Sequence, residues 1–171
     1  GEETNESHTI YKTGFSDWCA NCHNDMHSGN TTNYVHPTSV ALGSVAATYN
    51  AYVSSDNLTG GTQATAYLAL VPYEDVDANL AALDSTNYEW GPEANDRVMC
   101  GTCHRAHASA FPDAGRWDFT ETFLADSHPQ ATDGNATADD LANMYYNYTF
   151  VQNQRSLCNK CHAKDFGDAP Y

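Results

Sequence analysis

The pentapeptide Cys100-Gly101-Thr102-Cys103-His104 has the pattern Cys-x-x-Cys-His, which occurs three times in this chain. The other two copies are Cys19-Ala20-Asn21-Cys22-His23 and Cys158-Asn159-Lys160-Cys161-His162. All six cysteines of the 171-residue chain belong to these three motifs. A pattern that uses every cysteine indicates one shared chemical role for the six thiols.

Three familiar uses of paired cysteines fit this pattern poorly. A zinc site needs four ligands and has no use for a histidine after every second cysteine. A disulfide framework does not require identical tight pairs that are each followed by histidine, and a thioredoxin-like pair needs a βαβ context that the sequence lacks. The interpretation that fits is covalent attachment of c-type haem, in which both thiols bond the porphyrin and the histidine binds the iron.

The motifs therefore predict three haem c groups as cofactors. The predicted attachment residues are Cys19, Cys22, Cys100, Cys103, Cys158 and Cys161. The predicted proximal iron ligands are His23, His104 and His162. Because haem is attached to such motifs outside the cytoplasm, we expect an extracellular or cell-surface protein, with the periplasm as the alternative.

The sixth ligand of each iron is predicted to be histidine. The histidines outside the motifs are His8, His27, His36, His107 and His128. Methionine is the alternative ligand, and the chain has Met26, Met99 and Met144. Met144 falls on an apolar helical face and is expected in the core. Because five histidines are available for three irons, bis-histidine ligation is the simplest interpretation, and it predicts low reduction potentials.

Position along the chain restricts what each of these histidines can bind. His27 follows His23 by four residues and His107 follows His104 by three, too close to bind the same iron but suitably placed for a neighbouring haem. His36 and His128 each precede proline, which favours an extended backbone at the histidine. For each of the five, the alternative is an ordinary surface or buried histidine.

Composition excludes several classes of partner. The net charge is −15, from 7 Lys plus Arg against 22 Asp plus Glu. This charge argues against nucleic acid, whose phosphates bind cations, and against anionic membrane surfaces. It favours solubility, or charge-based selection among protein partners.

The sequence also bears on membrane and targeting segments. No apolar stretch is long enough to span a membrane. The start Gly1-Glu2-Glu3 is interpreted as a mature terminus left after signal-peptide cleavage.

A modest core and little regular structure are expected. The mean hydropathy is −0.58 and 41% of the residues are hydrophobic, so bound haems would supply apolar mass that the chain lacks. We predict one domain over residues 1–171, mostly irregular with a few α-helices wrapped around three haems. Residues 1–18 form an N-terminal extension with turn signals at Gly14 and at Ser16-Asp17.

Local patterns predict a few further elements. A helix is expected from about Thr137 towards Cys158, because a cap-like start precedes apolar residues at helical spacing. Residues 75–83 also show helical spacing, residues 39–53 fit either a helix or irregular structure, and residues 54–65 are expected to form a loop. Sequons that permit surface glycans stand at Asn5, Asn30, Asn57, Asn135 and Asn147.

The motifs and their surroundings resemble small three-haem c-type cytochromes from metal-reducing bacteria. Cys22-His23-Asn24-Asp25-Met26-His27 followed by His36-Pro37-Thr38 is similar to that family's CxxCHxxFH and HPT segments. Arg97-Val98-Met99-Cys100 through Ser109, then Pro112-Asp113 and Arg116-Trp117-Asp118, resembles its RVMC, CHRAHAS, PD and RWD segments. Cys158 to His162 with Lys164-Asp165 is similar to its last motif.

The resemblance implies particular distal ligands. Position by position, these are His27, His36 and His107. His128 lies where the family usually has a glycine-rich loop, and His8 lies in the N-terminal extension. These two are the alternates, and either would serve a haem of a neighbouring subunit.

Three functions follow as hypotheses. The first is electron transfer in an extracellular conducting filament, built from copies of the chain stacked end to end. The second is a soluble periplasmic carrier that exchanges electrons with other redox proteins. The third, a haem reductase, is disfavoured because three six-coordinate irons leave no position open for a substrate; we therefore expect no enzymatic activity.

Overall fold

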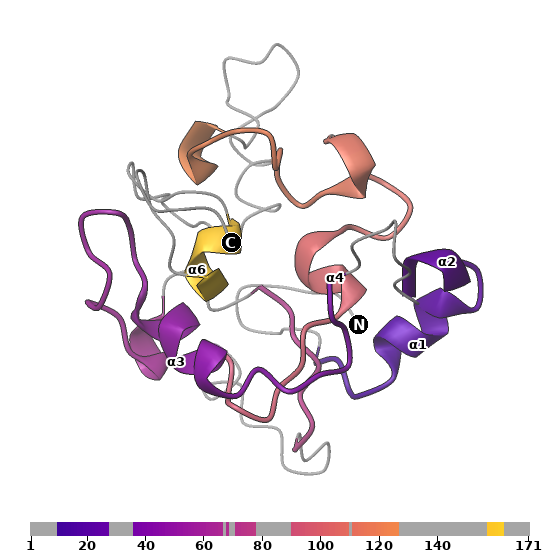
Figure 1. Cartoon of the computed structure of the whole chain (residues 1–171), viewed down its shortest axis with the longest axis horizontal. Helices are drawn as coiled ribbons and strands as arrows, with labels where there is room; N and C mark the ends of the chain where they lie inside the picture. The colour runs from indigo at the N-terminus through magenta and orange to yellow at the C-terminus, as the bar shows by residue number, and fades with distance from the viewer. Residues whose placement is uncertain are drawn as a thin grey trace.

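The computed structural model describes residues 10–27, 36–66, 68, 71–77, 90–109, 111–126 and 157–162. Within these residues the helices are short (Figure 1) and run in the order α1 (Phe15–Ala20), α2 (Asn24–His27), α3 (Ser44–Ala51), η1 (Gln63–Thr65), α4 (Cys100–Cys103), η3 (Pro112–Ala114), η4 (Leu124–Asp126) and α6 (Leu157–His162). The described residues form isolated β-bridges but no sheet. The predicted fold class, mostly irregular with a few α-helices, is confirmed.

Helix α1 corrects the expectation for the N-terminal region. Gly14 does mark a turn, with a φ of 97° that glycine adopts without strain. Ser16 and Asp17, however, lie in the first turn of α1 and not in a turn before it. The Ser16 N–H donates to a Glu74 carboxylate oxygen at 3.1 Å, which satisfies a helix-start donor from a part of the chain that sequence proximity does not reveal.

Other local expectations have mixed outcomes. Residues 39–53 contain helix α3, which resolves the open alternative in favour of a helix. Residues 54–65 form a turn closed by a Ser54–Asn57 bridge, followed by the single turn η1. Residues 75–77, the described start of the predicted 75–83 helix, are not helical. The predicted helix after Thr137 lies outside the described residues, as do the sequons other than Asn57. No described helix combines the length and apolar character needed to cross a membrane.

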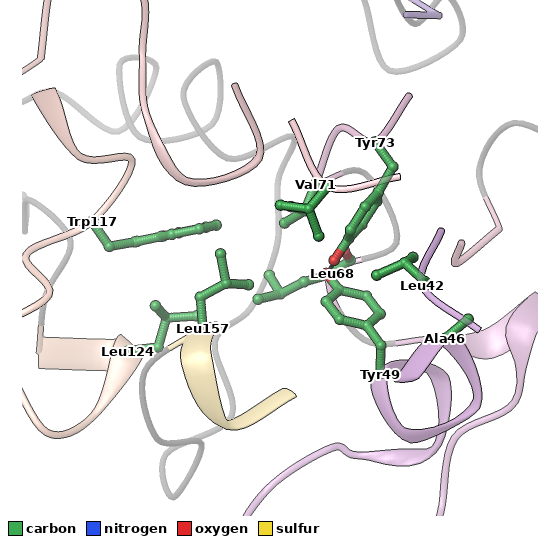
Figure 2. Close-up of a cluster of buried hydrophobic side chains, with 10 residues drawn as sticks. Leu42, Ala46, Tyr49, Leu68, Val71, Tyr73, Trp117, Leu124 and Leu157 are labelled. Atoms are coloured by element: carbon green, nitrogen blue, oxygen red, sulfur yellow. Dashed lines mark hydrogen bonds between the residues drawn. The ribbon is translucent and has the colours of Figure 1, made fainter. Parts of the chain in front are cut away.

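The hydrophobic core joins α3 to α6 (Figure 2). Tyr49 of α3 is fully buried, and its hydroxyl donates to the Leu68 carbonyl at 2.7 Å. The buried side chains around it are Leu42, Ala46, Leu68, Val71, Tyr73, Val98, Trp117, Leu124 and Leu157. Cys103 and Cys161 pack against this cluster, so the core holds the second and third motifs in place.

Asp96 is a buried carboxylate in the turn that precedes the second motif. Burial raises its pKa to about 6 from 3.8, and the nearby Asp75 and Glu93 carboxylates add to the rise, while the backbone N–H groups of Glu93 and Val76 oppose it. The folded state therefore binds more protons than the unfolded state between these two pH values. Consequently, the contribution of Asp96 to the free energy of unfolding falls as pH rises through this range. This loss of stability is fully present above pH 6.

Replacing Asp96 with asparagine should flatten this pH dependence. Between about pH 4 and about pH 7 the wild type should lose about 2–3 kcal/mol of unfolding free energy relative to Asp96→Asn. Guanidinium unfolding at a series of pH values measures the difference. The exposed Asp126 provides a matched control, since Asp126→Asn should give a curve parallel to wild type. A parallel curve for Asp96→Asn itself would show that the folded-state pKa is not raised.

Candidate haem-binding sites

Each Cys-x-x-Cys-His motif lies on or at the end of a short helix. Helix α4 spans the two cysteines of the second motif, and α6 contains the whole third motif. In the first motif α1 ends at Ala20, and the Cys22 and His23 N–H groups both donate to the Cys19 carbonyl. Helical spacing places the two thiols of a motif on one side of the backbone, as attachment to one haem edge requires.

The three motifs lie close to one another. The Cys19 thiol forms a hydrogen bond with Cys100, which joins the first motif to the second. Cys103 of the second motif lies near Cys158 and Cys161 of the third. Burial raises the pKa of Cys103 to about 12 and that of Cys161 to about 11. In the view of Figure 1, α4 lies between α1 and α6.

Two pairs of histidine rings, each joining distant parts of the chain, lie close together with their planes inclined, at 53° for His23 and His107 and at 75° for His36 and His162. The ring centroids of His23 and His107 are 6.3 Å apart, and those of His36 and His162 are 6.4 Å apart. Metal–imidazole bonds of about 2 Å on opposite sides of one ion place the two ring centroids roughly 6 Å apart. Each pair combines a motif histidine with a predicted distal histidine, so these residues fit bis-histidine binding of haem iron.

Segment 112–116 fixes the orientation of His104. The His104 Nδ1 lies 2.8 Å from the Asp113 carbonyl, to which its N–H donates. Arg105 N–H donates to the Ala114 carbonyl and Arg116 N–H to the Cys103 carbonyl, while Arg116 Nε donates to the Gly101 carbonyl at 2.6 Å. A proton held on Nδ1 leaves Nε2 as the metal-binding nitrogen. Sequence reasoning assigned no role to this segment, although Pro-Asp and Arg-Trp-Asp soon after the motif were a usable signal.

Gly115 lies where the chain packs tightly against the residues that follow it. A Cβ added there would lie 2.5 Å from the Trp117 carbonyl oxygen and 2.9 Å from the Phe119 ring. We expect Gly115→Ala to destabilise the protein by about 1–3 kcal/mol in denaturant unfolding, because backbone must move. Gly60→Ala is the control, since the nearest atoms to its Cβ belong to the Asn57 side chain, which can move. Equal stability of the two variants would contradict the need for glycine at position 115.

The other predicted distal ligands differ in what the structure shows. His107 has a φ of 58°, in the left-handed region that non-glycine residues rarely adopt. Partial burial lowers the pKa of His36, the nearby His162 lowers it further, and the Pro37 backbone opposes this; a lower pKa favours the neutral imidazole that binds metals. His27 ends α2. His8 and His128 lie outside the described residues.

The third motif contains a buried lysine that sequence reasoning missed. Lys160 is fully buried, its Nζ donates to the Tyr52 carbonyl at 2.7 Å, and it lies 4.5 Å from the centre of the Tyr49 ring. Burial lowers its pKa to about 7. These contacts anchor α6 to α3. The residues between motif cysteines vary freely in the pattern, so this contact has no signature in the sequence.

An irregular chain that gathers several Cys-x-x-Cys-His helices has the architecture of multihaem c-type cytochromes. This chain is a homologue of one of them, the C-type cytochrome OmcS of Geobacter sulfurreducens, with 39% identity over 188 aligned residues. The match covers 96% of this chain and 43% of OmcS. The resemblance noted in the sequence is thereby confirmed at the level of multihaem cytochromes.

Solved structures give the same result. The chain matches the Outer Membrane Cytochrome S filament from Geobacter sulfurreducens with a TM-score of 0.66 and 37% identity. It matches the OmcS nanowires from the same organism with a TM-score of 0.70 and 35% identity. Each match covers 96% of this chain and 46% of the other, so the chain spans less than half the length of these relatives. No family model matches the sequence.

Proposed function

We propose that this chain transfers electrons through three covalently bound c-type haems, as a subunit of an extracellular filament. The observation that carries this proposal is the separation of 6.3 Å and 6.4 Å between motif and distal histidine rings. When bound, haem supplies the one-electron chemistry, and the protein holds and orients it. The similarity to OmcS filaments supports the same chemistry and location.

For two of the irons we propose ligands on the basis of the ring pairs. His23 and His107 bind the haem attached at Cys19 and Cys22, and His162 and His36 bind the haem attached at Cys158 and Cys161. His107 thus serves a haem other than that of its own motif. Among the three preferred distal histidines this leaves His27 for the iron bound by His104. His8 and His128 remain the alternates for that position, or for a haem of a neighbouring subunit.

Two imidazoles on each iron leave no position open for a substrate. The chain is therefore proposed to be an electron carrier and not an enzyme. Histidine in place of methionine as the distal ligand keeps the potentials low. The partners would be further copies of the chain, end to end, and the redox proteins that supply and receive electrons.

Filament formation is supported by the relatives, whose solved structures are a filament and nanowires. Copies that join head to tail without closing a ring produce such fibres. The alternative is a monomeric periplasmic carrier, and the acidity of this chain, with a net charge of −15, favours solubility and so suits that alternative.

Electron microscopy of the native protein distinguishes these two states. We expect uniform filaments that are many subunits long. A matched preparation in about 1 M salt tests whether charge repulsion limits assembly, since screening lengths there fall to about 3 Å. Dispersed particles of monomer size under both conditions would contradict the filament proposal and favour the soluble carrier.

A further inference from the structure

Glu74 is a buried acid that haem attachment and iron binding leave unused. Its side chain is fully buried. Oε1 accepts the Ser16 N–H at 3.1 Å, whereas the buried Oε2 has no hydrogen-bond partner among the described residues. Arg97 and Glu74 are joined by hydrogen bonds between their backbone groups. The Glu74 N–H donates to the Arg97 carbonyl at 2.9 Å, and the Arg97 N–H donates to the Glu74 carbonyl at 3.0 Å. The Arg97 Nε is itself without a partner within the described chain.

This carboxyl group lies beside the first two haem motifs. Ser16, which it contacts, belongs to α1 and precedes Cys19 by three residues. The Ser16 hydroxyl accepts the Cys100 N–H at 3.2 Å, so a hydrogen-bonded chain runs from Glu74 through Ser16 to α4. Helices α1 and α4 lie side by side in Figure 1, and the Cys19 thiol forms a hydrogen bond with Cys100.

Leaving such a group buried and unpaired is costly. A carboxylate removed from water needs compensating charges or several hydrogen bonds, and the Glu74 carboxylate accepts one from the described residues. An uncompensated buried charge next to a cofactor changes the energy of that cofactor's charge states. A negative charge favours the oxidised iron, which carries one more positive charge than the reduced iron. Its effect is strong here because buried charges are poorly screened by solvent and salt.

We propose that Glu74 is a potential-setting residue, whose buried carboxylate lowers the reduction potentials of the haems attached at the first and second motifs. This inference rests on the proposed function. The third motif instead contains the buried Lys160, whose Nζ donates to the Tyr52 carbonyl. Tyr11 is paired with Glu74 through a backbone bridge, and the Asp75 N–H donates to the Tyr11 carbonyl.

Glu74→Gln tests the charge with little change in shape. Redox titration of the haem-loaded variant, followed by its absorption spectrum, should show two of the three potentials raised and the third unchanged. We expect a shift of about tenfold in the redox equilibrium constant, which is about 59 mV for one electron. Glu121→Gln is the matched control, since it removes the same charge from an exposed position. Equal titration curves for the two variants would overturn the proposal.

Ser16→Ala separates charge from positioning. It removes the hydroxyl that accepts the Cys100 N–H but keeps the Glu74 carboxylate and the Ser16 backbone N–H that binds it. The proposal predicts that Glu74→Gln raises the potentials more than Ser16→Ala does. A larger or equal shift in Ser16→Ala would assign Glu74 a structural role only.

Wild-type protein provides a test that needs no variant. In about 1 M salt, surface charges are screened beyond about 3 Å, and the proposal predicts that the haems at the first and second motifs keep lower potentials than the haem at the third. Convergence of all three potentials would overturn the proposal if Glu74→Gln yields no folded protein. Absence of haem from the purified protein would instead refute the proposed function, so the two failures are distinguishable.

Discussion

Replacing His107 with alanine is expected to convert one of the three haems from low-spin to high-spin. The His107 ring faces His23 with a centroid separation of 6.3 Å, and its removal leaves the iron of the first motif with one protein ligand. The affected haem should then bind carbon monoxide after reduction, while the other two do not. Electron paramagnetic resonance and the carbon monoxide difference spectrum measure the changed fraction, about one third.

Added imidazole is the control for this variant. A free imidazole can occupy the position of the missing side chain, so it should restore the low-spin signal and displace carbon monoxide. Restoration shows that the loss is one of ligation and not of folding. An unchanged spectrum in His107→Ala would show that His107 binds no iron, and that its unusual φ of 58° has another cause.

Replacing His36 with alanine should open a different haem. His36 faces His162 at a centroid separation of 6.4 Å, so the iron of the third motif loses its distal ligand. Because the two ring pairs belong to different irons, the double variant His36→Ala, His107→Ala should have about two thirds of its haem in the high-spin form. The effects of changes at separate sites add.

The double variant is the decisive comparison for the ligand assignment. A high-spin fraction equal to that of either single variant would mean that both histidines act on one iron. His128→Ala provides a reference from among the alternates, and it should leave all three haems low-spin if His27 binds the second iron. A high-spin centre in that variant would instead assign His128 to the iron bound by His104.

The sequence alone predicts the chemistry of the candidate sites but not how they are built. The three motifs predict the attachment cysteines and proximal histidines because two thiols and a following histidine form a local pattern. Pairing is not local: His107 follows the second motif but faces His23 of the first. Only the fold determines which distal histidine reaches which motif, and the sequence therefore left five candidates open.

The supporting contacts were less predictable still. The carbonyl of Asp113 orients His104, yet a backbone carbonyl carries no signature in the sequence. Ser16 and Asp17 have the composition of a turn, but a buried contact from Glu74, far along the chain, lets a helix begin there. Lys160 stands at a variable position of its motif, and the packing of α6 on α3 buries it. In each case a tertiary contact outweighs the local preference.

Near-infrared magnetic circular dichroism of the purified native protein tests the central claim most directly, because this signal reports the axial ligands of each low-spin ferric haem. The account predicts three haems per chain, all with the signal of two histidine ligands. Fewer than three such haems, or any haem with the band of methionine ligation, would contradict it.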